Sequence, residues 1–371
     1  MKRKKKFKDV LWLCMIVMSV VACKQKPVDT PSTAIQRDSS WALLPFVKVD
    51  SVNPVLTAGT NTFKCPILKS HVKWDEKDVF NPAAVVRDGK VYLLFRAEDK
   101  IGKYAGTSRL GLAVSDDGVH FTKMKEPVFF PDNDSLKQYE WEGGVEDPRI
   151  VESADGRYIM TYTAYDGTVA RLLVATSSDL IHWVKHGRVL QGRYKNAWSK
   201  SGAIVSRVNG EHVVAEKING KYWMYFGDTN LFMATSDDLI HWMPVREDDS
   251  LKSVLKPRKG YFDSRLVESG PYAILTEKGI VLIYNGMNLE AGGEPGLAPG
   301  AYCGGQALFD KNDPTKLIDR LEKNFIKPEK PYEITGQVNQ VCFLEGLVYF
   351  KGKWLLYYGT ADSKIAVAIH E

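Results

Sequence analysis

Short apolar segments, each about the length of a β-strand, recur through the chain between polar turns. Five of them follow a turn that contains glycine or charged residues, as Asp88-Gly89-Lys90 precedes the first. The five segments are residues 91–96, 158–163, 222–228, 280–286 and 354–359. Apolar runs that flank such turns are typical of β-hairpins. Because a strand must also precede each turn, as at residues 83–87 and 273–276, the pattern predicts five hairpins.

A second pattern repeats along the chain. A strand, a polar turn and an aromatic residue occur in the same order in residues 112–121, 174–183 and 233–242. Copies about sixty residues apart indicate a repeat architecture. Each turn carries a histidine at the same position: His120, His182 and His241. A residue that repeats with a turn belongs to the turn, so we expect these histidines to support it and not to catalyse.

The hairpins, the strands that follow them and the lack of long helical periodicity predict an all-β protein, a five-bladed β-propeller. In such a fold the first strands of the blades line a central channel. Loops at one end of that channel form a pocket. Polar residues near the starts of these strands are therefore candidates for a shared site.

The stretch of residues 142–150 is the strongest of these candidates. It places two acids, Pro148 and Arg149 just before a strand-like run and behind two glycines. Pro148 fixes its own φ and pushes Asp147 toward an extended conformation. A stiffly held carboxylate suits proton transfer, which needs hydrogen-bond reach to its target. The simpler interpretation is a turn in which the acids pair with Arg149.

Polar residues occupy the matching place in each predicted blade. They are Asn81 in the first blade, Asp147 in the second, Lys200-Ser201 in the third, Glu268 in the fourth and Asn339 in the fifth. Because the first strands meet at the channel, these residues should converge. Convergence favours a functional site around Asp147 over turn chemistry.

The N-terminus has the pattern of an export signal. A basic segment at residues 2–8 precedes an apolar run at residues 10–21, which ends in Ala22-Cys23. This resembles a bacterial lipoprotein signal closely. We expect a signal peptide at 1–22, a lipidated Cys23, a flexible tether at 23–40 and the catalytic propeller at 41–371. The protein would then be exported and lipid-anchored to the cell envelope, at the outer membrane or facing the periplasm. An ordinary secretory signal or an uncleaved anchor are the alternatives.

Charge and cysteine content give no indication of a nucleic-acid partner, a disulfide framework or a metal site. The chain carries a net charge of +5, and the predicted signal peptide accounts for that excess with its six basic residues and Asp9. A nearly neutral mature protein gives no indication of a nucleic-acid partner. Cys65, Cys303 and Cys342 lie far apart, which predicts buried thiols or at most one disulfide. We expect neither a metal site nor a cofactor.

With these residues in view, the chain resembles glycoside hydrolase family 130, the mannoside phosphorylases and mannosidases, over roughly residues 70–368. The motifs that carry the resemblance are Asn81-Pro82-Ala83, Leu94-Phe95-Arg96-Ala97, Gly144-Val145-Glu146-Asp147-Pro148-Arg149, Lys200-Ser201-Gly202-Ala203-Ile204 and Tyr357-Tyr358-Gly359-Thr360-Ala361-Asp362. The family fold is a five-bladed β-propeller, which agrees with the count of hairpins.

The resemblance implies roles for several residues. Asp147 matches the proton donor, which in the phosphorylases is thought to act through the 3-hydroxyl of the bound mannose, with inversion at the anomeric carbon. Asn81, Arg96 and Asp362 match positions that hold the mannosyl unit. Carboxylate and guanidinium groups suit this task because their hydrogen bonds are charge-assisted.

Two departures from the phosphorylases concern phosphate. The chain has Tyr284-Asn285-Gly286 where they carry Tyr-His-Gly, and Asp228 lies where they carry a basic segment. Asp228 would repel a phosphate dianion. Lys200 remains, but one lysine is a poor phosphate site. We include Arg149, Lys200, Asp228 and Asn285 among the substrate-binding candidates.

An inverting hydrolase needs a second carboxylate to activate water. Glu268 and Glu216 are the candidates for this base; Glu216 can instead pair with Lys217 at a strand edge. Export also favours hydrolysis, because an exported enzyme would lose a sugar phosphate. The sequence therefore predicts an inverting β-mannosidase, and the resemblance suggests β-1,2-linked manno-oligosaccharides as substrates.

Three alternatives remain open. The first is a β-mannoside phosphorylase that yields mannose 1-phosphate and binds phosphate with Lys200, Arg149 and Arg265. The second is a glycan-binding lipoprotein without catalysis. The third is a five-bladed glycosidase for arabinosides or fructosides; those enzymes usually place an aspartate early in the first blade, where this chain has Asn81.

Overall fold

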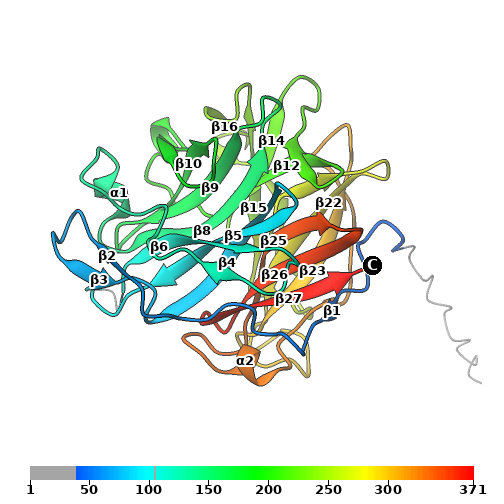
Figure 1. Ribbon diagram of the computed structural model, residues 1–371. Coiled ribbons are helices and arrows are strands. Elements are labelled where there is room, and N and C mark those ends of the chain that lie inside the picture. The colour runs from blue at the N-terminus through cyan, green and yellow to red at the C-terminus, as the bar shows by residue number, and fades with distance from the viewer. Residues whose placement is uncertain (1–38, 104–105) are drawn as a thin grey trace, which may run out of the picture. The chain divides into compact units, whose positions relative to one another are not determined.

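The computed structural model describes residues 39–103 and 106–371 (Figure 1). The predicted signal peptide, the lipidation site Cys23 and residues 24–38 of the predicted tether lie outside the described residues. Of that tether, Ser40 is described, and its carbonyl oxygen and hydroxyl accept hydrogen bonds from Lys278 Nζ at 2.8 Å.

The described residues are almost entirely β-structure, which confirms the all-β prediction. Their helices are limited to α1 (Lys137–Glu140), α2 (Pro331–Ile334) and the single 3₁₀ turn η1 (Gly192–Tyr194). No helix in this part of the chain is long and apolar enough to cross a membrane.

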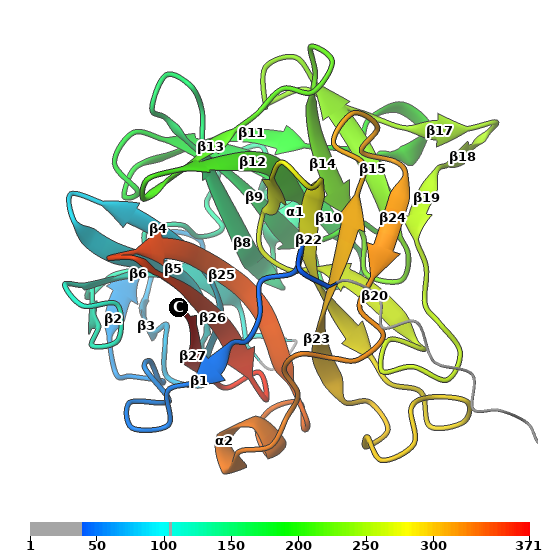
Figure 2. The same cartoon turned by 90° about the vertical axis from the view of Figure 1, so that its right-hand side faces the viewer.

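Most strands pair antiparallel with their neighbours in sequence (Figures 1 and 2), and we divide them along the chain into five groups for description. The first group is β4 (Asp78–Arg87), β5 (Lys90–Glu98), β6 (Ser108–Ser115) and β7 (Thr122–Lys123). The second is β8 (Gly144–Glu152), β9 (Tyr158–Tyr165), β10 (Ala170–Ser177) and β11 (Trp183–Arg188). The third is β12 (Ala203–Asn209), β13 (His212–Ala215), β14 (Tyr222–Phe226), β15 (Leu231–Ser236), β16 (Trp242–Pro244) and β19 (Ser253–Leu255).

The last two groups complete the pattern. The fourth is β20 (Leu266–Ser269), β21 (Ala273–Leu275), β22 (Ile280–Met287), β23 (Tyr302–Phe309) and β24 (Leu317–Arg320). The fifth is β25 (Cys342–Phe350), β26 (Lys353–Thr360), β27 (Lys364–His370) and, paired beside β27, the early strand β1 (Val47–Lys48), as Figure 2 shows. Two small hairpins lie outside the groups: β2 (Thr62–Lys64) with β3 (His71–Lys73), and β17 (Arg246–Glu247) with β18 (Ser250–Leu251).

The hairpin turns form where the sequence predicts them. Between β4 and β5, Arg87 pairs with Lys90 across a two-residue turn in which Asp88 and Gly89 have φ of 51° and 68°. Two positive φ values in succession are typical of the type I′ turn, whose twist matches that of the strands. Lys351 and Gly352, with φ of 49° and 82°, repeat this geometry between β25 and β26.

The repeated histidines lie in turns, as predicted. Nδ1 of His120, His182 and His241 lies 2.7 Å from an aspartate oxygen three residues earlier. In the first copy, Asp117 also accepts the backbone N–H of His120 at 2.9 Å. These contacts close the turns. The predicted buried thiols are present too, since Cys65, Cys303 and Cys342 are buried and free.

The first strands of the groups are buried in their centres and lie close to one another. All residues of β4 between its two ends are buried, and β4 packs beside both β8 and β25 (Figure 1). Ser108 pairs in parallel with Gly144, and Val205 with Ala273, so neighbouring groups also join directly. Apolar clusters fill the spaces between sheets; in one of them Trp74 and Phe95 stack with ring centroids 6.0 Å apart. This packing fixes the inner ends of the strands.

We predict that Gly144→Ala destabilises the protein far more than Gly156→Ala. Gly144 has φ of +115°, and a Cβ there would lie 2.3 Å from the Ser108 carbonyl oxygen. Gly156 also has positive φ, at +80°, but a Cβ there would have no heavy atom within 4 Å. We expect Gly156→Ala to cost about 1 kcal/mol from backbone strain, and Gly144→Ala about 3 kcal/mol because overpacking adds to it. Urea unfolding of both variants measures the difference, and equal losses would contradict the close approach.

Candidate active site

Interrupted strand pairing places the polar residues of the site. The register shifts at Asn81 in β4, between Glu146 and Arg149 in β8, and at Glu345 in β25. Asn81 and Asp147 have φ of 45° and 48°, and Ser201, just before β12, has 59°. A bulge of this kind redirects a side chain that would otherwise continue the alternation of the strand. Four groups of strands thus present a polar residue at an equivalent place.

Asp147 lies at the centre of these residues and is 2% exposed. Its Oδ1 accepts hydrogen bonds from Asn81 Nδ2 at 3.0 Å and from Arg96 Nη1 at 3.2 Å. Its Oδ2 faces Lys200 Nζ at 3.7 Å. The structure therefore brings Asn81, Arg96, Asp147 and Lys200 together from three groups of strands.

Glu268, in β20, is the second carboxylate near Lys200. It is 3% exposed, accepts a 2.5 Å hydrogen bond from the Ser201 hydroxyl, and has its Oε1 3.8 Å from Lys200 Nζ. The two contacts to one ammonium limit the separation of the Asp147 and Glu268 oxygens. The upper limit that they set allows the lower part of the inverting range, about 6.5–9.5 Å, and also the shorter spacing of retaining enzymes, about 5–5.5 Å.

Arg96 and Asp362 border the same site. Arg96 Nη2 donates to Glu98 at 2.7 Å and to Glu146 at 3.0 Å. Asp362 follows β26, is partly exposed and has φ of 49°. Burial raises the pKa of Asp362, and repulsion from Asp147 adds to this effect, whereas Arg96 opposes it. The pKa reaches about 7. Its charge in turn acts on Arg96.

The carboxyl groups of Glu146 and Asp147 differ in protonation. Burial raises the pKa of Glu146, and repulsion from Asp147 adds to this, so that it reaches about 7 despite Arg96. Burial also acts to raise the pKa of Asp147, but Arg96, Lys200 and the hydrogen bond from Asn81 outweigh it and hold that pKa below the usual range. Below about pH 7, Glu146 therefore holds a proton in the free site while Asp147 is ionised.

Arg149 contacts the backbone around the site and Glu345, and its predicted role in substrate binding stays a prediction. Its Nε donates to the carbonyl oxygen of Gly270 at 2.6 Å and its Nη2 to that of Ser269 at 2.8 Å. Its Nη1 donates to the Asp147 carbonyl at 3.1 Å and lies 3.6 Å from Glu345 Oε1. The guanidinium is thus directed at the backbone on both sides of the site, where it fixes Asp147 relative to Glu268.

Asn285 bonds to the backbone of β25, and its predicted contact with substrate stays a prediction. Its side chain is fully buried, donates to the Leu344 carbonyl at 3.0 Å and accepts from the Leu344 N–H at 2.8 Å. These bonds replace backbone pairing between β22 and β25. Asp228, by contrast, is near the predicted site, since its negative charge acts on both Lys200 and Glu268.

Glu216 does not join the other candidates. It follows β13, is partly exposed, and its charge acts on Tyr222, as does that of Asp155 in the turn before β9. Among the contacts of residues 39–103 and 106–371, no hydrogen bond or ion pair links Glu216 to Asp147 or Glu268. Of the two predicted bases, the structure places only Glu268 beside Asp147.

Two further residues that the sequence analysis named are exposed. Asn339 is exposed in the loop before β25, where its Oδ1 accepts the Gly336 N–H at 3.3 Å. Arg265 is exposed as well. In the fifth group, Glu345 occupies the position that the sequence analysis expected for Asn339. Glu345 is 2% exposed, and burial raises the pKa of its carboxyl group well above the usual range. An acid followed by glycine inside the apolar run of residues 342–350 was the available sequence signal.

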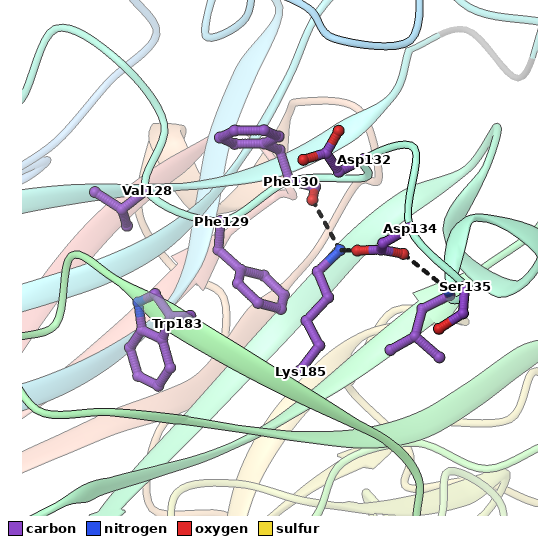
Figure 3. Close-up of a pocket in the computed structure, with 9 residues that line it drawn as sticks. Val128, Phe129, Phe130, Asp132, Asp134, Ser135, Trp183 and Lys185 are labelled. Atoms are coloured by element: carbon purple, nitrogen blue, oxygen red, sulfur yellow. Dashed lines mark hydrogen bonds and ion pairs between the residues drawn. The ribbon is translucent and has the colours of Figure 1, made fainter.

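A pocket of about 330 Å³ lies away from these residues (Figure 3). It is bordered by the loop of residues 128–136 and by Trp183 and Lys185 of β11. Lys185 Nζ points at the Phe130 carbonyl and at Asp134 (Figure 3). It also pairs with Glu140. None of the candidate catalytic residues lines this pocket. Among the described residues no cluster of three histidines, cysteines or acids has the arrangement of a metal site.

Comparison with known proteins agrees with a mannoside-active site. The model of glycoside hydrolase family 130, described as β-1,4-mannooligosaccharide phosphorylase, matches residues 60–371. A 1,2-β-oligomannan phosphorylase of Thermoanaerobacter sp. (strain X514) is 34% identical over 82% of this chain and 95% of its own. By themselves, the curated relatives favour the phosphorylase alternative over the predicted hydrolase.

Solved structures are more similar still. A glycosyl hydrolase from Bacteroides ovatus is 49% identical, with a TM-score of 0.87, over 90% of this chain and 95% of its own. Another solved structure is described in these words: the GH130 family of mannoside phosphorylases contains glycoside hydrolases that target β-1,2 mannosidic linkages in Candida mannan. It is 48% identical, with a TM-score of 0.87, over 89% of this chain and 94% of its own.

We predict a pH-dependent stability difference between the wild type and Asp362→Asn. The folded protein holds a proton on Asp362 up to about pH 7, whereas the unfolded chain releases it near pH 3.8. The wild type therefore loses stability from this group as the pH rises through that interval, and asparagine does not. From pH 4.5 to pH 8, the stability of the variant relative to wild type should rise by about 2 kcal/mol, after allowance for partial exposure. Urea unfolding of both proteins at both pH values measures this change. A stability difference that stays constant with pH would contradict the raised pKa of Asp362.

Proposed function

The chain belongs to glycoside hydrolase family 130, and we propose that it hydrolyses β-mannosides with inversion at the site around Asp147 and Glu268. The observation that supports hydrolysis is the pair of carboxylates that share Lys200, at 3.7 Å and 3.8 Å. An acid and a base on two sides of one lysine can act on opposite faces of a sugar ring when the gap between them admits a water.

The charges around the site also favour water over phosphate. Arg96 is paired with Glu98 and Glu146, and Arg149 faces backbone carbonyls and Glu345. Lys200 lies between two acids. A phosphate dianion needs several donors free to bind it, and nearby carboxylates repel it. Arg96 and Lys200 thus already have carboxylate partners, and the donors of Arg149 are engaged by backbone carbonyls.

The mechanism assigns the two carboxylates opposite tasks. Glu268 accepts a proton from a water, whose oxygen attacks the anomeric carbon while the glycosidic bond breaks. The leaving oxygen receives a proton supplied by Asp147, directly or through the 3-hydroxyl of the mannose. Asp147 is ionised in the free site, so it must gain this proton with the substrate. A bound sugar excludes water and thereby raises the pKa of a carboxyl group. Mannose with inverted configuration is the product.

Phosphorolysis is the second candidate, and the curated relatives favour it. In that reaction phosphate replaces water, Asp147 keeps its role and mannose 1-phosphate is the product. Lys200 would then have to exchange a carboxylate partner for phosphate. The two candidates differ in whether turnover depends on phosphate.

Two further parts of the proposal concern fold and location. We infer that the five groups of strands are the blades of a five-bladed β-propeller; the neighbouring positions of β4, β8 and β25 and the pairing of β1 with β27 support this. We also infer export and lipid anchoring at Cys23, supported by the basic and apolar segments that precede it.

We predict that Asp147→Asn and Glu268→Gln each reduce kcat on β-1,2-mannobiose in phosphate-free buffer by about 10²–10⁴-fold, the range typical of a lost general acid or base. Glu216→Gln should stay within about twofold of wild type, because a residue outside the site does not contact the reacting atoms. Asp155→Asn, in the exposed turn before β9, is the matched control for the aspartate. The rate of mannose release measures the activity of all four variants.

The products decide between the candidates. If turnover requires phosphate and yields mannose 1-phosphate, the enzyme is a phosphorylase and Glu268 is not a base. If wild type releases no product from mannosides with or without phosphate but binds them, the protein is a glycan-binding lipoprotein. With Glu268→Ala, added azide should restore turnover and form the α-mannosyl azide, because a small anion can replace the activated water.

We predict that Cys23→Ser abolishes incorporation of labelled fatty acid during expression in a bacterial host, because the thiol is the acceptor of the lipid. The variant should also leave the membrane fraction. Labelling of wild type is the reference, and equal labelling of both proteins would contradict the lipoprotein signal.

A further inference from the structure

Trp198 is the most exposed tryptophan among the described residues, with 52% of its surface accessible. It lies in the loop between η1 and β12, two residues before Lys200. A single exposed apolar residue is common on proteins, so exposure alone indicates little. The position of this indole is what gives it significance.

A short hydrogen bond ties the indole to the margin of the site. Trp198 Nε1 donates to Asp228 Oδ2 at 2.6 Å. The charge of Asp228 acts on Lys200 and on Glu268. The turn that carries Asp228 is also tied to β20, because the Val267 N–H donates to the Thr229 carbonyl at 3.1 Å. Trp198 is therefore bonded to a residue in a turn that joins the segment of Glu268.

The backbone around Trp198 is fixed on both sides. The Ala197 N–H donates to the Tyr194 carbonyl at 2.9 Å, and the Ser199 N–H donates to the Ala170 carbonyl at 3.1 Å. The Gly227 N–H donates to the Lys200 carbonyl at 2.9 Å, which holds the Asp228 turn against the same segment. A ring presented by an anchored backbone loses little freedom when it binds a ligand.

A second aromatic ring lies beside Trp198. Tyr165, at the end of β9, meets it edge-on with ring centroids 6.4 Å apart. Tyr165 packs so closely on Gly143 that a Cβ there would lie 2.3 Å from its Cδ1. The two rings therefore border the stretch that carries Asp147, on the side of the site occupied by Lys200 and Asp228.

We propose that Trp198 and Asp228 form the subsite for the sugar on the leaving-group side of the scissile bond. The indole packs against the C–H face of a pyranose, and Asp228 accepts a hydrogen bond from one of its hydroxyls. This rests on the proposed function. Asn81, Arg96 and Asp147 are enclosed, whereas Trp198 is exposed. A glycan whose terminal mannose occupies the enclosed part therefore extends past the indole toward solvent.

The proposal predicts the substrate class: mannosides whose leaving group is a second pyranose. β-1,2-mannobiose has such a leaving group, whereas β-mannosyl fluoride releases only fluoride. We expect Trp198→Ala to lower kcat/KM on the disaccharide about tenfold or more and on the fluoride far less, because an interaction with the leaving sugar is absent from the fluoride. Trp198→Phe keeps an apolar ring without the N–H and should lie between Ala and wild type on the disaccharide.

Val184→Ala is the matched control, since it removes an exposed apolar side chain of β11, 62% accessible, away from the site. All variants are assayed with and without phosphate, so the comparison holds whether water or phosphate accepts the mannosyl group. Equal losses on both substrates, or no loss on either, would overturn the subsite and leave the proposed function intact. If wild type cleaves neither substrate, the proposed function fails and the subsite with it.

A binding measurement removes the dependence on catalysis. In the Asp147→Asn protein, β-1,2-mannobiose should change the intrinsic tryptophan fluorescence, because a sugar on the indole displaces water from its face. The double variant Asp147→Asn, Trp198→Phe should lose that change and bind more weakly. An identical fluorescence change in both proteins would place the sugar elsewhere and refute the subsite.

Discussion

Left-handed backbone at the inner ends of the strands is the constraint on which the site depends. Asn81, Asp147, Ser201 and Asp362 all have φ between 45° and 59°. An L-residue pays about 1–2 kcal/mol for this conformation, so the surrounding pairing must hold it in place. Asn81 and Asp147 lie at bulges within strands that are paired on either side, whereas Ser201 precedes β12 and Asp362 lies between β26 and β27. The strain is what turns side chains from separate sheets toward one point.

The same constraint explains why small residues surround the acids. A Cβ at Gly359 would lie 2.1 Å from Asn81 Oδ1, and one at Gly144 would collide with Ser108. Asn81 can donate to Asp147 only because β26 lacks a side chain at that point. Glycine here serves close approach between neighbouring sheets, and this need is not visible in the hydrophobic pattern. The same few glycines therefore allow both the close packing of neighbouring sheets and the hydrogen bonds of the site.

The sequence could predict the strands, the turns and the central carboxylate, because alternation, turn residues and the Asp-Pro-Arg motif are local features. It could not separate Glu268 from Glu216, because both are acids within strand-like segments and only the pairing of β12, β13 and β20 decides which one reaches Lys200. The sequence could not show the long-range backbone contacts of Arg149 and Asn285 for a related reason. Their partners are backbone atoms 59 to 121 residues away, and a sequence does not show which backbone groups lack partners. Glu345 was missed because its place depends on a bulge.

Lys200 is the group on which the choice of acceptor depends. Its contacts of 3.7 Å and 3.8 Å with Asp147 and Glu268 are ion pairs, but they exceed the 2.7–2.9 Å of a charge-assisted hydrogen bond. Arg96 and Arg149, by contrast, make contacts of hydrogen-bond length in which their donors are engaged. The ammonium of Lys200 can therefore donate to a group that enters between the two acids. A neutral water or sugar hydroxyl can take that position without disturbing either carboxylate. A phosphate dianion would have to meet both negative charges at once, and protonation of Glu268 or of Asp147 would be needed to admit it.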